Sequence, residues 1–362
     1  MNFVDNQSHS YYIFYYYLIM TNLEVSEREK RILYSVIDNY IKTGEPVGSS
    51  FLVSKYQLPW SPATIRSVMF DLMDKQYLVQ PHISAGRIPT EKGIRIYINS
   101  ILSQRELPRY KRTVIRRRYR QLDGTFNEVI YETSIMLSDI SNCTGLATLP
   151  STRSMKIKST KLVKIAEKKV LVIIVFENGM IDQRMIGLSR KLPEGMLRKL
   201  SDYVNKLTMA LTLDEVDSIV IDKLKHERKI YREFLERVIK FWTGKYDIGL
   251  KSGVFIKGNP SIFDNYRLNN PDGLKALFRA LEEKAFLVEI LGKAMHEDSN
   301  IVFLGAENGV PAGYSVVAAP YGTNKNLGTL GVLGPLRMDY AQIVPLVDYT
   351  AKIVSKIVST GG

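Results

Sequence analysis

The sequence has few of the residues that build covalent or metal-bound structure. Its 362 residues include one cysteine, Cys143, and four histidines. One cysteine excludes an intramolecular disulfide and a cysteine-rich zinc site, and the histidines lack the spacing of metal ligands. No glycine-rich phosphate loop, nucleophile and base, or pair of carboxylates stands at a recognisable spacing. We therefore expect no metal, no cofactor, no enzymatic activity, and a reducing, cytoplasmic environment.

Long apolar runs are also missing. Residues 11–20, YYIFYYYLIM, form an apolar and aromatic run of ten, whereas a membrane-spanning helix needs about 20 residues. No lysine or arginine precedes Arg28, so the basic start of a signal peptide is absent. The sequence supports neither export nor membrane insertion. We interpret residues 1–22 as an unstructured or mis-started extension, with Met20 as the initiator; the alternative is an apolar arm that packs elsewhere.

Composition and charge point to a multidomain globular protein with a polyanionic partner. Hydrophobic residues make up 45% of the chain and charged residues 24%, and the length exceeds that of one core. The formal net charge is +13; residues 1–122 hold 18 Lys and Arg against 10 Asp and Glu, and the rest hold 32 against 27. The N-terminal excess suits nucleic acid. A basic surface that only serves solubility is the alternative.

The most informative stretch is residues 61–90, SPATIRSVMFDLMDKQYLVQPHISAGRIPT. Ser61 suits the N-cap of a helix and Pro62 its first turn. The apolar residues that follow recur at helical spacing and predict one buried stripe, which leaves the opposite face exposed. The stripe comprises Ile65, Val68, Met69, Leu72 and Met73.

A hairpin and two earlier helices complete the pattern. A strand over 78–82, a turn over 84–86 and an outgoing segment over 87–89 predict a small hairpin, and Thr90 suits the cap of a helix over 90–102. Upstream, Ser26 and Glu29 have capping-box spacing before a helix that ends at Gly44. A second short helix is predicted from Ser49 or Ser50. This order is typical of a winged helix-turn-helix.

Four blocks of sequence resemble one known family. They are GEPVGS (44–49), SPATIR (61–66), SAGRIPT (84–90) and GPLRMDYAQIVPLVDYTAK (334–352), in this order along the chain. On these blocks the chain resembles the heat-inducible transcription repressor HrcA. The resemblance implies a multidomain α+β fold: an N-terminal winged helix-turn-helix, a GAF-like antiparallel α+β domain, and a mainly helical dimerisation domain inserted in it.

The rest of the chain is consistent with such an insertion. After a helix over 126–140, strands are expected at 162–165, 170–176 and 180–188, joined by a type I′ turn at Asn178-Gly179. Helices at 194–207, 214–241 and 272–294 follow, with one strand at 254–257. Further strands are expected at 301–304, 314–318 and 327–333, before a helix at 339–358. We expect domains at 23–104 (winged helix), 123–190 with 300–362 (GAF-like) and 191–299 (inserted).

Residues 105–122 form a basic linker in this scheme. Eight lysines and arginines fall within it. It either lies along DNA phosphates or is the solvated face of a helix that enters the next domain.

A winged helix places its third helix in the major groove and its hairpin against the backbone. We therefore expect eight DNA-binding residues: Ser61, Thr64, Arg66, Ser67, His82, Ser84, Gly86 and Arg87. Arg66 is the best candidate for base reading, because guanidinium can donate two hydrogen bonds to guanine. The alternatives are a surface pair of Arg66 with Asp71 or Asp74, and a hairpin that is only a turn. Relatives carry Asn-Glu where this chain has Ser67-Val68, and Thr where it has Ile83.

Reading an inverted repeat requires two modules, so we expect a homodimer. An apolar strip on the predicted helix 214–241 and just beyond is the expected interface; internal packing is the alternative. The strip comprises Tyr231, Phe234, Leu235, Val238 and Trp242. Arg337 and Asp339, in the last block, are expected to cap a helix and to pair.

The resemblance implies a repressor of heat-shock chaperone operons that binds an inverted-repeat, CIRCE-type operator in double-stranded DNA. It also implies a chaperonin partner that keeps the repressor active. A sensor that binds a small molecule in its GAF-like domain is the alternative from another class.

Overall fold

The computed structural model describes residues 25–101, 106–122, 126–150, 155–188, 191, 193–213, 215–216, 254–258, 284–296, 300–305, 309–311, 313–322 and 327–360. These residues form mixed α/β structure with antiparallel sheets. They fall into two compact units: one within 1–106, 303–315 and 334–345, the other within 107–302, 316–333 and 346–362. Within the described ranges no helix is long and apolar enough to cross a membrane.

The N-terminal part of the first unit contains three helices, a hairpin and a fourth helix, in the predicted order. The elements are α2 (Glu27–Thr43), α3 (Ser49–Tyr56), α4 (Pro62–Asp74), β1 (Leu78–Val79), β2 (Ile88–Pro89) and α5 (Glu91–Ile101). The first strand is shorter than expected, because regular pairing is limited to Leu78 with Pro89 and Val79 with Ile88. Beyond Val79, side-chain hydrogen bonds replace the ladder.

Local capping explains why these helices begin and end where they do. The Ser26 hydroxyl accepts from the Glu29 amide at 3.3 Å, and the Glu29 carboxylate accepts from the Ser26 amide at 2.7 Å, so the predicted capping box is present. Gly44 ends α2 with φ 72°, a left-handed conformation that glycine adopts without strain. Ser61 caps α4, with Pro62 in its first turn.

The predicted apolar stripe of α4 is buried. Ile65, Val68, Met69 and Leu72 are buried, and Met73 is half-buried. The other main apolar side chains of this core come from α2, α3, the hairpin and α5: Ile32, Leu33, Val36, Ile37, Leu52, Tyr77, Leu78, Ile94 and Ile98. Their burial supplies the main driving force for this part of the fold.

A five-stranded sheet, in the order β7-β3-β10-β9-β8, brings together strands from between residues 144 and 335. Its strands are β3 (Thr144–Thr148), β7 (Val254–Lys257), β8 (Ile301–Leu304), β9 (Tyr314–Tyr321) and β10 (Gly328–Pro335). The helices around it are α6 (Arg109–Arg120), α7 (Phe126–Ser141), α13 (Lys284–Met295) and α14 (Tyr340–Thr360). Every residue of β10 is buried, as is typical of a central strand covered on both faces.

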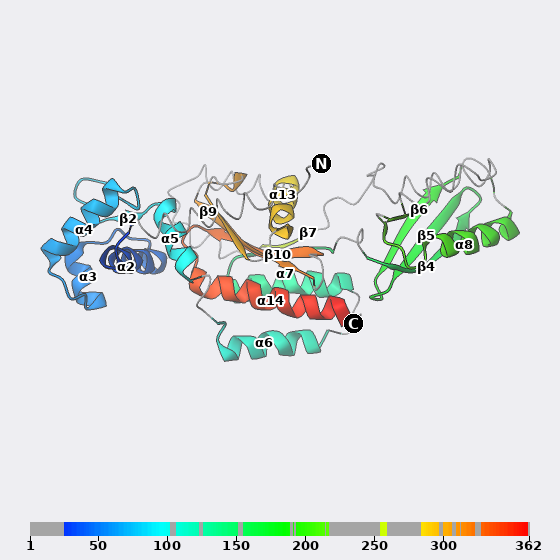
Figure 1. The fold of residues 1–362 in the computed structure, drawn as a ribbon, viewed down its shortest axis with the longest axis horizontal. Helices are drawn as coiled ribbons and strands as arrows, with labels where there is room; N and C mark the ends of the chain where they lie inside the picture. The colour runs from blue at the N-terminus through cyan, green and yellow to red at the C-terminus, as the bar shows by residue number, and fades with distance from the viewer. Residues whose placement is uncertain are drawn as a thin grey trace, which may run out of the picture. The chain divides into compact units, whose positions relative to one another are not determined.

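Helices cover both faces of this sheet. In Figure 1, α7 and α14 lie along one face and α13 lies on the other. A side chain at Gly145 of β3 would overlap with the Ser134 carbonyl oxygen of α7, so glycine allows this helix to approach closely. On the opposite face, Thr329 donates to the Leu291 carbonyl of α13 at 2.8 Å.

A separate three-stranded sheet, β4-β5-β6, has its own core. It consists of β4 (Ile157–Ala166), β5 (Lys169–Phe176) and β6 (Ile181–Gly187), and α8 (Glu194–Thr208) packs on one face. The free edge of β4 is covered because the Thr160 amide donates to Asn205 at 2.7 Å and the Leu162 amide to Ser201 at 3.0 Å. In the hairpin between β5 and β6 only Gly179 has positive φ, at 81°. The loop is thus not the expected type I′ turn.

This arrangement differs from the expected domain boundaries. The boundary near residue 190 falls between β6 and α8, which share one buried core that includes Val172, Ile186 and Leu200. Conversely, β7 was expected in the inserted domain but pairs with β3. Periodicity defines each strand but not its partner, because pairing depends on contacts between distant segments.

Candidate nucleic-acid interface

The exposed face of α4 carries the residues expected to read DNA. Arg66 and Ser67 are exposed, whereas the predicted residues Ser61 and Thr64 are engaged in the helix cap. The Ser61 hydroxyl accepts from the Thr64 amide at 3.1 Å and lies 2.9 Å from the Thr64 hydroxyl. The cap therefore uses part of the hydrogen-bonding capacity of these two residues. The side chains of Arg66 and Ser67 take no part in this cap, so their hydrogen-bonding groups remain available to a partner.

Arg66 is exposed on this face, one position after the buried Ile65. Among the described residues it forms no ion pair, with Asp71 and Asp74 included. The alternative interpretation of Arg66 as half of a surface pair is therefore not realised. Its guanidinium is open to a partner on the exposed face of α4.

The tip of the β1-β2 hairpin is held by one glutamine. The Gln80 amide donates to the Ile83 carbonyl at 2.7 Å and to the Ala85 carbonyl at 3.0 Å. These two bonds fix the turn that the short strands leave unpaired. The predicted residues His82 and Ser84 are exposed there, and Ile83 between them is 100% exposed.

Gly86 has a structural reason for lacking a side chain. A Cβ at this position would overlap with the backbone carbonyl of Val47, because Val47 and Arg87 form a bridge with hydrogen bonds of 2.9 and 2.8 Å. Gly86 was one of the eight residues expected to bind DNA. The close approach in the structure is to Val47, which lies before α3.

The side chain of Arg87 points back into the protein. Its Nε lies 2.7 Å from the Met73 sulfur and its Nη1 donates to the Ala85 carbonyl at 3.2 Å. Arg87 is half-buried as a result. That Arg87 binds DNA stays a prediction. Binding would require its side chain to exchange the contacts with Met73 and Ala85 for contacts with DNA.

Two further arginines stand beside the start of α4. The guanidinium carbons of Arg28 and Arg31, both on α2, lie 5.6 and 5.8 Å from the ring centre of Trp60. Trp60 is half-buried and directly precedes Ser61, the N-cap of α4. Sequence patterns did not single out these residues, because the three-residue spacing of the arginines is informative only once Trp60 is known to lie beneath them.

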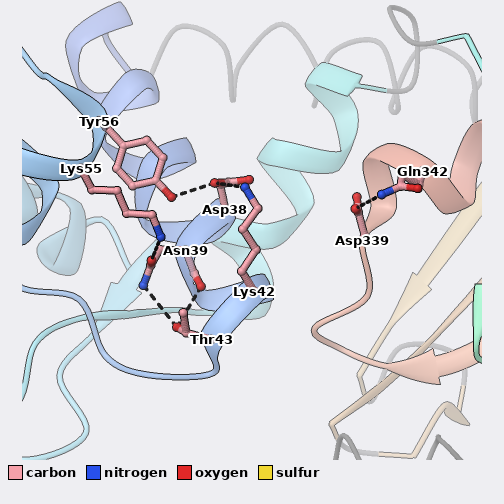
Figure 2. A network of polar contacts seen from close by, with 8 residues as sticks. All are labelled: Asp38, Asn39, Lys42, Thr43, Lys55, Tyr56, Asp339 and Gln342. Carbon is pink, nitrogen blue, oxygen red and sulfur yellow. Dashed lines mark hydrogen bonds and ion pairs between the residues drawn. The ribbon is translucent and has the colours of Figure 1, made fainter. Parts of the chain in front are cut away.

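A polar network joins α2 to α3 (Figure 2). The Asp38 carboxylate accepts from the Tyr56 hydroxyl at 2.7 Å and from Lys42 at 2.8 Å, and Lys55 donates to the Asn39 side chain at 2.6 Å. Burial raises the pKa of Asp38, but hydrogen bonds from Lys42 and Tyr56 outweigh burial, so the pKa lies below its ordinary value. Burial and the bond to Asp38 raise the pKa of Tyr56. The network fixes how α3 sits on α2.

A second ionic contact joins α2 to the end of α4. Lys75, the C-cap of α4, lies 2.7 Å from the mostly buried Glu29 carboxylate. Burial raises the pKa of Glu29, yet hydrogen bonds from Lys75 and Ser26 lower it by more. The same carboxylate thus caps α2 and anchors α4.

The last of the four sequence blocks, residues 334–352, also contacts α2 within the first unit. The Arg337 guanidinium lies against Gly44 and 6.0 Å from the ring centre of Tyr40. Asp339 precedes α14, and its backbone carbonyl accepts from the Gln342 and Ile343 amides at 3.0 and 2.9 Å. Its carboxylate accepts from the Gln342 side chain at 2.7 Å (Figure 2). Asp339 thus stands at the start of α14, where its carboxylate bonds a side chain of the first turn; capping of the backbone amides by this carboxylate and pairing with Arg337 stay predictions.

The predicted basic linker contains the helix α6. Arg118 lies 2.8 Å from Asp139 of α7, and the Tyr119 hydroxyl lies 2.6 Å from the Thr133 hydroxyl. Only Ile115 is buried in α6, and its remaining arginines mostly face outward. This geometry matches the interpretation as the solvated face of a helix; contact with phosphate stays a prediction. The predicted interface residues Tyr231, Phe234, Leu235, Val238 and Trp242 lie outside the described part of the chain.

Comparison with known proteins places the chain in a family. A family profile described as "HrcA protein C terminal domain" matches residues 127–344. A heat-inducible transcription repressor HrcA from Geobacter sulfurreducens is 36% identical over 338 residues, covering 92% of this chain and 98% of the relative. One from Syntrophobacter fumaroxidans is 30% identical over 344 residues, covering 94% and 99%. A crystal structure titled only as a hypothetical protein has the same fold, with a TM-score of 0.60, 19% identity, and coverage of 93% of this chain and all of that one.

Both relatives are transcription repressors by name, so the class is that of transcription regulators. The chain belongs to the HrcA family of heat-inducible transcription repressors.

Proposed function

We propose that this protein is a cytoplasmic, non-enzymatic DNA-binding repressor that reads an inverted-repeat, CIRCE-type operator ahead of heat-shock chaperone genes. The N-terminal unit acts as a winged helix-turn-helix: α2, α3 and α4 form the three helices, and β1 with β2 forms the wing. In this arrangement α4 enters the major groove and the wing contacts the DNA backbone.

One observation carries the proposal. Arg66 and Ser67 project from an exposed face of α4 whose opposite face is buried, and Arg66 pairs with no acidic residue of the described chain. An exposed guanidinium on a helix near a hairpin is the donor arrangement that reads guanine in the major groove. Family membership supports this interpretation, since the relatives are named as transcription repressors.

The protein would bind as a homodimer, because a two-fold operator is matched by two-fold protein symmetry. The three-stranded sheet supports a place for the interface in the inserted domain. One face of β5 packs on α8, while Leu171, Ile173 and Val175 lie on the other. Their register partners on β6 include Met185 and Ile181, which are 49% and 62% exposed. We place the inserted domain from residue 155, with β7 left in the GAF-like domain.

The chaperonin partner follows from the resemblance of the four sequence blocks. In that circuit the chaperonin keeps the repressor active, and client proteins that occupy the chaperonin release the operon. A repressor whose fold is only marginally stable suits such a circuit.

A gel-shift experiment tests the proposed function. The purified full chain is titrated against a duplex with an inverted-repeat chaperone operator and against a scrambled duplex of the same length. We expect the operator to be bound at least tenfold more tightly, as for a specific site. Adding chaperonin should raise the active fraction. Equal binding to both duplexes would refute operator recognition.

A further inference from the structure

Arg28 and Arg31 form a pair of positive charges on one face of α2. Residues three apart on a helix are neighbours, and both guanidinium groups lie over the same Trp60 ring, at 5.6 and 5.8 Å. A guanidinium that packs on an aromatic face loses rotational freedom but keeps its N–H groups available to an acceptor. We call these three residues the arginine platform.

Within the described residues, no acidic side chain compensates the charge of the platform. The two nearest acidic residues on α2 are already engaged, since Glu27 pairs with Lys30 at 2.8 Å and Glu29 pairs with Lys75 at 2.7 Å. No carboxylate in the described part of the chain forms an ion pair with Arg28 or Arg31. Both side chains are exposed.

Arg28 and Arg31 are not placed where they would stabilise the fold. Arg28 lies in the first turn of α2, where the helix dipole disfavours a positive charge. Two like charges held side by side also repel each other. A buried or paired arginine would stabilise the helix, but both arginines are exposed and neither is in an ion pair in the part of the chain that the structure describes. An anion that binds between or beside the two guanidinium groups would offset the repulsion between them.

The arginine platform is adjacent in sequence to α4, the proposed reading helix. Trp60 is followed directly by Ser61, the N-cap of α4, so their Cα atoms are about 3.8 Å apart. A helix that lies in the major groove has phosphates beside its N-terminal end. Phosphates along a DNA strand supply closely spaced negative charges, which suits two neighbouring guanidinium groups.

We propose that Arg28 and Arg31, held by Trp60, bind two DNA phosphates at the edge of the groove that α4 enters. This inference rests on the proposed function, and it assigns the platform to affinity and positioning, with no part in base reading. Contacts to phosphate fix the register of a protein on DNA without reading its sequence.

Salt dependence of binding tests the inference. Fluorescence anisotropy of the full chain is measured with the inverted-repeat operator duplex and with a random duplex of the same length, over a series of salt concentrations. The variants are Arg28→Ala/Arg31→Ala and Arg28→Lys/Arg31→Lys. The control is Lys199→Ala/Lys206→Ala, which removes the same charge from two exposed positions of α8.

For the alanine pair we expect the slope of log affinity against log salt to fall by about one per arginine in each protomer. Affinity should fall by the same factor on both duplexes. The lysine pair should keep the wild-type slope, and the α8 control should behave as wild type.

An unchanged slope in the alanine pair would overturn the inference, and so would a loss confined to the operator duplex. Wild-type protein that binds both duplexes equally would refute operator recognition, while a reduced slope in the alanine pair would still support the platform.

Discussion

On α4, neighbouring residues have opposite roles because each step along a helix rotates the side chain by about 100°. Ile65 is buried, Arg66 and Ser67 are exposed, and Val68 is buried again. This alternation was predictable from spacing alone. Spacing did not predict that the Ser61 and Thr64 hydroxyls bond each other, because capping geometry depends on backbone angles that periodicity does not specify.

Substitution Arg66→Ala should weaken binding to the operator by about 1–3 kcal/mol, and binding to random duplex by less. The reason is that a base contact contributes only where the correct base is present. Arg66→Lys serves as the charge-preserving control and should retain binding to random duplex. Competition gel shifts with both duplexes measure the difference. Equal losses on the two duplexes would reassign Arg66 to phosphate.

Gly86→Ala should destabilise the protein by about 1–3 kcal/mol, because the new methyl group meets backbone atoms of Val47 that cannot move independently. Chemical denaturation measures the change. Gly195→Ala is the matched control: nothing lies within 4 Å of its added Cβ, and alanine is favoured over glycine in a helix such as α8. A neutral Gly86→Ala would show that the bridge between Val47 and Arg87 is not rigid.

At the scale of elements, features that depend on residues close in the sequence were predicted, and features that depend on residues far apart were not. The start of α2 was predictable because Ser26 and Glu29 are three residues apart and the capping bonds between them are local. The Lys75–Glu29 pair was not, since its partners are 46 positions apart and meet only after α4 packs on α2.

This pair gives α2 and α4 a dependence on pH. The pKa of Glu29 is lowered in the folded state, so its stabilising effect is present above the unfolded pKa and is lost as the pH falls through the folded pKa. We expect the free energy of unfolding to fall between about pH 5 and about pH 3, and Glu29→Gln to lack about 0.5–1 kcal/mol of that change. The estimate is modest because Lys75 is partly exposed.

Denaturant titrations over that pH range, on wild type and Glu29→Gln, measure the difference. Glu27→Gln is the control, because Glu27 pairs with Lys30 on the surface, where its side chain is 90% exposed. Parallel pH curves for Glu29→Gln and wild type would contradict the assigned role of Glu29.

At the scale of the whole molecule, the sequence predicted most of the described strands but not which of them share a sheet. β7 alone, with four residues, carries no signal that it pairs with β3, more than a hundred positions earlier. The hairpin β5-β6 could be predicted because Asn178-Gly179 is a local turn signal. Its separation from the five-stranded sheet could not, because that depends on which helix covers its apolar face. Here α8 does, through Leu197, Leu200 and Val204.

The last prediction concerns the face of the β4-β5-β6 sheet that α8 does not cover. Its central residues Leu171 and Val175 pair with Met185 and Ile181, and these edge positions are exposed apolar side chains. A sheet with apolar residues on both faces is expected to have a partner on each.

If that partner is a second copy of the chain, Ile181→Asp should shift the sedimentation of the protein from dimer to monomer. It should also weaken binding to the full inverted repeat far more than to a half-site. Met209→Asp makes the same chemical change at a site of similar exposure, 56% against 62%, just beyond α8 and outside the sheet, and should leave the dimer intact. A dimer of wild-type affinity in Ile181→Asp would exclude this face as the interface.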